Sequence, residues 1–146
     1  MAQINFYTLS SEDPVARLQF ACRLAEKACS LGHQVYIETE SAEQARAVDD
    51  LLWQFKAASF VPHRLAGSDI DKNIDNNVES VVIGSNAADS SHDDVFINLG
   101  NTACEAHQKF SRINEIVGVD KQSLEQGRIR YRYYKGLGYQ PETHKL

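Results

Sequence analysis

Ile4-Asn5-Phe6-Tyr7-Thr8-Leu9 opens the stretch that decides the fold, which runs through Asp13-Pro14 and Gly32 to Gln34-Val35-Tyr36-Ile37-Glu38-Thr39. Both hexapeptides are rich in β-branched and aromatic residues, a composition that favours strands. Between them, apolar residues recur at helical spacing. Asp13 suits the N-cap and Pro14 the first helical position, while Gly32 is a typical stop signal. The stretch therefore predicts strand, helix, strand.

A second helix follows and sets the fold class. Ser41 and Gln44 form a capping box, and Ala45, Val48 and Leu51 continue at helical spacing. Alternating strands and helices predict an α/β fold, in which a mainly parallel central sheet is flanked by helices and the crossovers are right-handed.

The rest of the chain supplies further elements of the same domain. No repeat or long linker divides the 146 residues, so residues 1–146 are predicted to form a single domain. The polar stretches 67–77 and 85–94 are expected to be surface loops. We expect strands at 80–83, 95–99 and 114–117, the second of them central and buried, and helices at 104–110 and 121–135.

The composition predicts a cytoplasmic protein. The hydrophobic fraction is 42%, and no apolar run approaches the eighteen or so residues needed to cross a bilayer. The first residues lack the basic start and apolar core of a secretory signal. Cys22, Cys29 and Cys104 have no paired spacing, so we expect buried, reduced thiols rather than disulfides or a zinc site.

Motifs of catalysis and cofactor binding are not found in the sequence. The first strand-to-helix turn, from Leu9 to Pro14, contains no glycine and carries two acids, which disfavours the phosphate binding seen in mononucleotide-binding folds. The five histidines lack metal-ligand spacing, and no serine or cysteine has the local setting of a nucleophile. We expect no catalytic residue, metal or cofactor. An α/β enzyme acting on a small phosphorylated ligand is the alternative.

An aromatic connection follows the second helix and contains Trp53, Phe60 and Pro62. Proline disfavours helix at the residue before it, so the segment around Pro62 is expected to be extended. Large aromatic residues on such a connection are either core residues or interface anchors. The residues themselves leave both interpretations open.

The last predicted helix carries a cationic and aromatic side. Residues 121–146 hold six Lys/Arg against two Asp/Glu, a charge of +4, whereas the rest of the chain carries −9. Leu124, Arg128, Tyr131 and Lys135 share one side of the helix. Such a surface suits a short acidic peptide that ends in phenylalanine. Single-stranded nucleic acid and an ordinary solvated face are the alternatives, although the acidic remainder of the chain opposes a polyanion.

Several short runs, taken together, resemble one protein family. They are Asn5-Phe6-Tyr7, Leu52-Trp53, Ser59-Phe60-Val61-Pro62-His63, Leu65-Ala66-Gly67, Asp94-Val95-Phe96-Ile97-Asn98-Leu99, Phe110-Ser111-Arg112 and Arg128-Ile129-Arg130-Tyr131-Arg132-Tyr133-Tyr134-Lys135. In this order they are similar to the chi subunit family of bacterial DNA polymerase III across nearly the whole chain. Ile129 and Gly136 depart from the family pattern, which has an acidic residue at the first position and more often a charged one at the second.

The resemblance implies a non-catalytic adaptor of DNA replication with a mononucleotide-binding-like fold and no bound nucleotide. It implies contact with nucleic acid only indirectly, through two protein partners, and a helicase-like alternative partner that competes for one of the two surfaces. The psi subunit, which connects chi to the clamp loader, would contact Trp53, Phe60 and Pro62. The acidic carboxyl-terminal tail of single-stranded DNA-binding protein would contact Val117, Arg128 and Tyr131, with Arg132 nearby.

Overall fold

The computed structural model describes residues 2–54, 63–65, 81–84, 93–100, 102–104 and 106–146. The stretches expected to be loops, 67–77 and 85–94, fall almost entirely outside the described residues. Along the chain the elements are β1 (Gln3–Thr8), α1 (Pro14–Ser30), β2 (Val35–Glu38), α2 (Ala42–Gln54), β3 (His63–Leu65), β4 (Val81–Gly84), β5 (Val95–Asn98), β6 (Arg112–Val117), α3 (Lys121–Gly136) and β7 (Glu142–Lys145).

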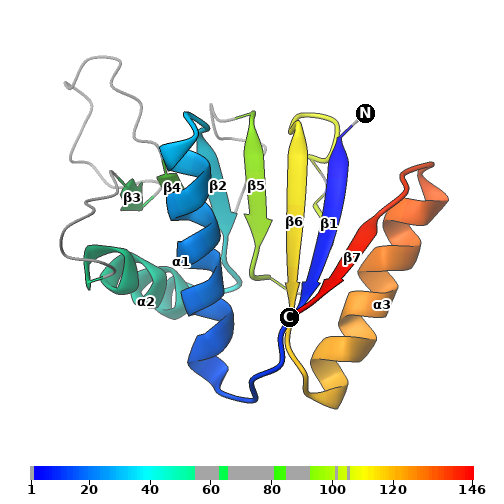
Figure 1. Cartoon of the computed structure of the whole chain (residues 1–146), viewed down its shortest axis with the longest axis horizontal. Helices are drawn as coiled ribbons and strands as arrows, with labels where there is room; N and C mark the ends of the chain where they lie inside the picture. Colours follow the sequence, from blue (N-terminus) through cyan, green and yellow to red (C-terminus); the bar gives the residue numbers. More distant parts are fainter. Residues whose placement is uncertain (1, 55–62, 66–80, 85–92, 101, 105) are drawn as a thin grey trace.

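One seven-stranded sheet organises the described part of the chain, in the order β3-β4-β2-β5-β6-β1-β7 (Figure 1). All neighbouring strands run parallel. β5 is the central strand, and each of its residues is buried. The predicted α/β class, the mainly parallel sheet and the central position of this strand are therefore confirmed.

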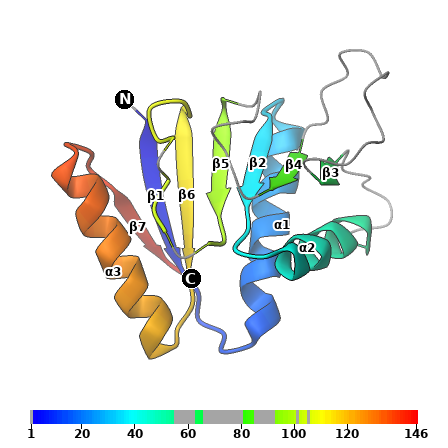
Figure 2. The ribbon, with the colours of Figure 1, turned by 180° about the vertical axis from the view of Figure 1, so that it is seen from behind.

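The helices cover both faces of the sheet. α1 and α2 lie on one face in Figure 1, and α3 lies on the other, as the opposite view in Figure 2 shows. After β1, the chain passes through α1 to β2, which lies towards one end of the sheet. After β6, it passes through α3 to β7, which forms the other end. The two crossovers run in opposite directions along the sheet and on opposite faces of it. They therefore have the same hand, as the rule for parallel sheets requires.

Alternating side chains of the strands form two apolar cores, one on each face of the sheet. In β2, Val35 and Ile37 pack beneath α1 and α2, while Tyr36 belongs to the core on the side of α3. Phe96 of β5 joins Tyr36 there, and the two ring centroids lie 6.0 Å apart. Coverage on both faces explains why these strands are apolar without alternation.

Helix boundaries follow the local signals in the sequence. Asp13 caps α1 with its carboxylate. Gly32, two residues after α1, has a φ of 89°, a conformation that residues with a Cβ rarely adopt. Ser41 caps α2 by accepting from the Gln44 N–H at 3.1 Å. The Gln44 side chain accepts from Glu40 rather than from Ser41, so the capping box is formed in only one of its two bonds.

Other details of the sequence prediction need correction. Within the predicted helix at 104–110, residues 106–109 form a turn instead, in which the Lys109 N–H donates to the Ala106 carbonyl at 2.9 Å. Cys104 and Phe110, on either side of this turn, are both buried in the core on the side of α3, so packing rather than helical spacing determines the conformation here. Cys29 is half-buried rather than buried, and the three cysteines form no disulfide.

Two strands, β3 and β7, were not predicted. β7 consists of Glu-Thr-His-Lys and forms one edge of the sheet, where it pairs with β1 alone. An edge strand tolerates polar residues on both sides, so it lacks the apolar pattern by which strands are recognised.

We predict that Asp13→Ala destabilises the protein by about 1 kcal/mol, because it removes the carboxylate that accepts from the Val15 N–H at 2.9 Å. Glu12→Ala is the matched control: the neighbouring acid is exposed and makes no hydrogen bond within the described residues. It should change the free energy of unfolding by less than about 0.5 kcal/mol. Urea unfolding curves measure both, and equal midpoints for the two variants would contradict the capping role.

Candidate functional site

A buried carboxylate anchors α3 to the sheet. Glu115 of β6 is 0% exposed. Its Oε1 accepts from Arg130 Nε at 2.7 Å and its Oε2 from the Tyr134 hydroxyl at 2.6 Å, while Asn98 Nδ2 lies 3.0 Å from both oxygens. Arg130 and Tyr134 are four residues apart and therefore share one side of α3. A single side chain of the sheet thus holds two successive turns of the helix.

Burial and hydrogen bonding act in opposite directions on this carboxylate. Burial raises the pKa of Glu115, whereas the charge of Arg130 and the hydrogen bonds from Tyr134 and Asn98 lower it. Burial and the neighbouring carboxylate raise the pKa of Tyr134, so its phenol stays protonated and donates to Glu115. The same phenol accepts from the Cys104 backbone N–H at 2.8 Å, which ties the turn before β6 to the helix.

The helix lies close against the sheet at Gly127. A Cβ placed there would lie 3.1 Å from both γ-carbons of Val117, closer than ordinary van der Waals contact. Val117 is only 5% exposed. It therefore lies directly beneath α3 and supports the helix, and little of its own surface is open to a ligand.

The predicted common side of Leu124, Arg128, Tyr131 and Lys135 lies at the boundary between core and solvent. Leu124 and Tyr131 pack partly buried against the core, whereas Arg128 and Lys135 are exposed. The Tyr131 ring lies 5.4 Å from that of Phe6, measured between centroids. This side of α3, which we call the cationic flank, has apolar rings at its base and two cations at its rim.

The residues expected to bind an acidic tail thus come together at one place. Arg128, Tyr131 and Arg132 lie within five residues of one another on α3, and Gly127 of the same helix packs against Val117. Arg128 and Arg132 are exposed and make no ion pair within the described part of the chain. By contrast, Arg130 faces inward, and sequence reasoning did not separate it from its exposed neighbours. The acidic residue Glu115 inside the predicted strand 114–117 was the available signal that a helix arginine is buried against that strand.

The residues expected to bind psi are described only in part. The backbone of Trp53 belongs to the last turn of α2, while Phe60 and Pro62 lie outside the described residues, as does the Trp53 side chain. α2 and α3 lie on opposite faces and towards opposite ends of the sheet (Figure 1). A ligand on α3 would therefore not meet one bound at the end of α2.

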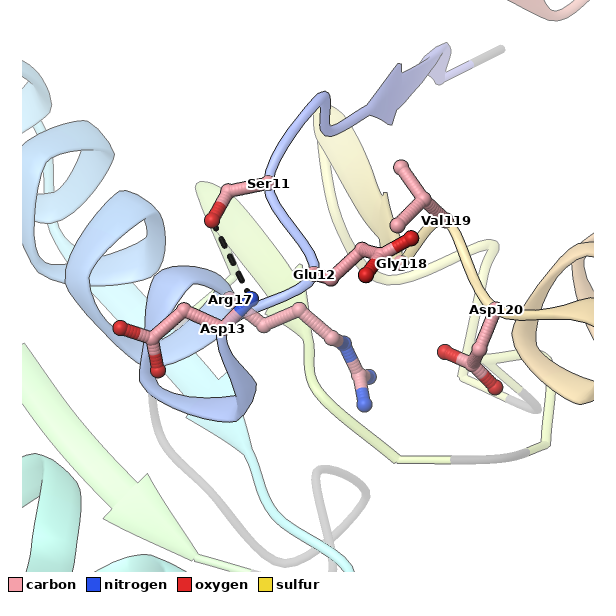
Figure 3. Close-up of a pocket in the computed structure, with 7 residues that line it drawn as sticks. All are labelled: Ser11, Glu12, Asp13, Arg17, Gly118, Val119 and Asp120. Atoms are coloured by element: carbon pink, nitrogen blue, oxygen red, sulfur yellow. Dashed lines mark hydrogen bonds between the residues drawn. The ribbon is translucent and has the colours of Figure 1, made fainter.

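A cavity of about 360 Å³ opens at the carboxyl ends of β1 and β6. The crossovers that follow these two neighbouring strands leave in opposite directions along the sheet. This is the usual ligand position of open α/β sheets. Figure 3 shows the Arg17 side chain extending between the two connections that line it. Its Nη2 donates to the Leu99 carbonyl at 2.9 Å, and burial lowers the pKa of Arg17. Glu12, Asp13 and Asp120 also line the cavity, so acidic groups outnumber the single guanidinium and oppose phosphate binding.

The described ranges show neither a metal-binding cluster nor a membrane-spanning helix. Within them, no three His, Cys, Asp or Glu side chains converge as metal ligands would. None of the helices found there has the length and apolar character needed to cross a bilayer.

We predict that Glu115→Gln costs about 3 to 5 kcal/mol of stability, because it removes the charged partner that lies 2.7 Å from the buried Arg130 Nε. Glu125→Gln removes an acid from the exposed side of α3 and should cost less than about 0.5 kcal/mol. Guanidinium unfolding followed by circular dichroism compares the two. A loss below about 1 kcal/mol for Glu115→Gln would show that the buried ion pair does not hold the helix.

Comparisons with known proteins agree on one family. The profile of "DNA polymerase III chi subunit, HolC" matches residues 1–142. The DNA polymerase III subunit chi of Pseudomonas aeruginosa is 36% identical over 146 residues, covering 100% of this chain and 98% of that protein. The Escherichia coli K12 subunit chi is 27% identical, with 98% and 97% coverage.

The fold is also found outside the family. The crystal structure of T4 UvsW matches with a TM-score of 0.69 over 99% of this chain and 42% of that one, at 11% identity. At this identity the similarity concerns the fold alone. The family profile and the full-length relatives carry the assignment: the chain belongs to the family of the DNA polymerase III chi subunit.

Proposed function

We propose that this protein is a non-catalytic adaptor of the replicative DNA polymerase III holoenzyme. It links the clamp loader, through the psi subunit, to the acidic carboxyl-terminal tail of single-stranded DNA-binding protein, in the cytoplasm. The observation that carries the proposal is the cationic flank of α3, where the open guanidinium of Arg128 stands beside the half-buried ring of Tyr131. The family to which the chain belongs supports the assignment to this polymerase.

The chemistry of the cationic flank matches an acidic peptide that ends in an aromatic residue. Arg128 offers a planar fork of donors to a carboxylate, and Arg132 adds a second positive charge one turn later. Tyr131 packs on Phe6 and is held from below, so its ring forms a firm wall for the ring of a ligand. The buried bonds of Arg130 and Tyr134 keep these groups in place before a peptide arrives.

The second contact of the proposed adaptor is with psi, through Trp53, Phe60 and Pro62. A helicase-like partner would compete with psi for the same surface. Because α2 and α3 lie towards opposite ends of the sheet, both contacts can form at once. Two modest contacts on one scaffold raise the effective concentration of the clamp loader at coated DNA.

The alternatives are less well supported. A small phosphorylated ligand would meet three acidic side chains in the cavity at the carboxyl ends of the strands. Direct binding of single-stranded nucleic acid would use the same cations on α3, but residues 1–120 carry −9 and would repel a polyanion beyond that helix.

We predict that Arg128→Ala costs about 1.5 to 3 kcal/mol of affinity for a peptide that ends in acidic residues and phenylalanine, the range for hydrogen bonds to charged groups. Arg128→Lys should recover only part of this, because lysine keeps the charge and loses the planar fork. A fluorescence titration with labelled peptide measures both. The exposed Arg23 of α1 provides the matched control, and Arg23→Ala should leave the affinity unchanged.

The same titration uses a peptide without its final phenylalanine, together with Tyr131→Ala. Both changes should weaken binding, because each removes one side of the ring contact. If Arg128→Ala and Tyr131→Ala bind the peptide with full affinity, or if the peptide binds equally well without its final phenylalanine, α3 is not the binding site.

For the psi contact, we predict that Trp53→Ala or Phe60→Ala weakens the complex with psi by more than about 2 kcal/mol, as buried aromatic anchors do. A pull-down with psi and a thermal melt of the free protein are carried out together. Arg128→Ala should leave psi binding unchanged, since the contacts are distant. Unfolding of the free protein in both aromatic variants would identify these residues as core and withdraw the assignment.

A further inference from the structure

Three large apolar side chains of α3 and its cap are exposed in a line. Ile129, Tyr133 and Leu137 are 61%, 42% and 42% exposed. They are four residues apart and so lie on one side of the helix, over a length of about 12 Å. Isolated exposed apolar residues are ordinary, but a contiguous row indicates a contact surface. We call this row the apolar stripe. Gln122 and Gln126 continue the same side without charge.

A row of cations, two of which form the rim of the cationic flank, runs between Tyr131 and the apolar stripe. Lys121, Arg128, Arg132 and Lys135 are all exposed, at spacings of seven, four and three residues, so they form a continuous ridge along the outer surface of α3. Glu125 is the one acidic residue of the helix. A path across the helix therefore runs from the half-buried Tyr131 over positive charge to the apolar stripe.

We propose that α3 binds its acidic peptide in two parts. The terminal ring and carboxylate lie at the cationic flank, the acidic residues cross the ridge, and the segment upstream of them lies on Ile129, Tyr133 and Leu137. The inference rests on the proposed function and extends the site to the opposite side of the helix. A helix is about 10 Å wide, so half its circumference is about 16 Å, a distance that about five extended residues cover. The stripe should therefore be reached only by residues more than about six positions from the peptide's end.

Charge decides which occupant fits the stripe. A second copy of the chain placed stripe against stripe would bring two cationic ridges close together, and like charges at a contact cost affinity. An acidic peptide neutralises the ridge as it crosses, and its upstream residues can then cover the apolar side chains. The ridge also lies directly beside the cationic flank, so the two contacts are continuous.

The test compares two probes, the last six and the last sixteen residues of the single-stranded DNA-binding protein from the same bacterium. The longer peptide should bind about five- to tenfold more tightly. The double variant Ile129→Asn/Leu137→Asn should abolish that gain and leave the affinity of the six-residue peptide within about twofold of wild type. Leu31→Asn, which changes an exposed leucine at the end of α1, should alter neither affinity.

Other outcomes overturn the inference in distinguishable ways. If the longer peptide still binds more tightly to the double variant, its upstream segment lies elsewhere on the protein. If the longer peptide binds no more tightly than the shorter one to the wild type, the site has one part only. Failure of the six-residue peptide to bind would remove the proposed function itself. Sedimentation of the free protein as a dimer that the double variant dissociates would assign the stripe to a second copy. A melting temperature within a few degrees of wild type confirms that the double variant is folded, as expected for exposed positions.

Discussion

The ion pair between Glu115 and Arg130 is the interaction on which the rest of this structure depends. The carboxylate is fully buried and accepts hydrogen bonds from α3 and from Asn98 of the central strand. An apolar pair of the same size could stabilise the protein equally well, but it would not specify the rotation of the helix. With Arg130 and Tyr134 directed inward and Gly127 against Val117, Arg128 and Arg132 must point outward. The surface chemistry of α3 therefore follows from a polar contact in the core.

The directions of the crossovers determine where the helices, and therefore their binding surfaces, lie on the sheet. Reversal of the chain direction between α1 and α3 places helices on both faces of the sheet and puts α2 and α3 towards its opposite ends. At the reversal itself, where similar folds hold ligands, Arg17 donates to Leu99 and Asp13 and Asp120 cap their own helices. Each of these three side chains thus makes at least one hydrogen bond to the backbone of the chain itself. The fold is shared with T4 UvsW. Within the described residues, the buried Nε of Arg17 is left without a hydrogen-bond partner.

Local signals in the sequence predicted most of the fold and part of the candidate site. β1, α1 and β2 were predicted because Asp13, Pro14 and Gly32 act within a few residues of themselves. The turn at 106–109 and the edge strand β7 were missed, since burial of Phe110 and pairing with β1 are tertiary effects. For the same reason helical spacing grouped Arg128 with Tyr131 but did not show that Arg130 faces inward. Its partner, Glu115, lies in a strand, and only the packing of α3 on the sheet brings them together.

We propose that α3, held by Glu115, is the surface that receives an acidic peptide. Chemical-shift mapping of the isotopically labelled protein, titrated with the six-residue peptide, tests it most directly. The account predicts that the largest changes fall on Leu124, Arg128 and Tyr131, with smaller ones at the underlying Phe6 and Val117, while α2 and the turn before α1 stay unchanged. Largest changes around Arg17 and residues 118–120, with α3 unaffected, would contradict it.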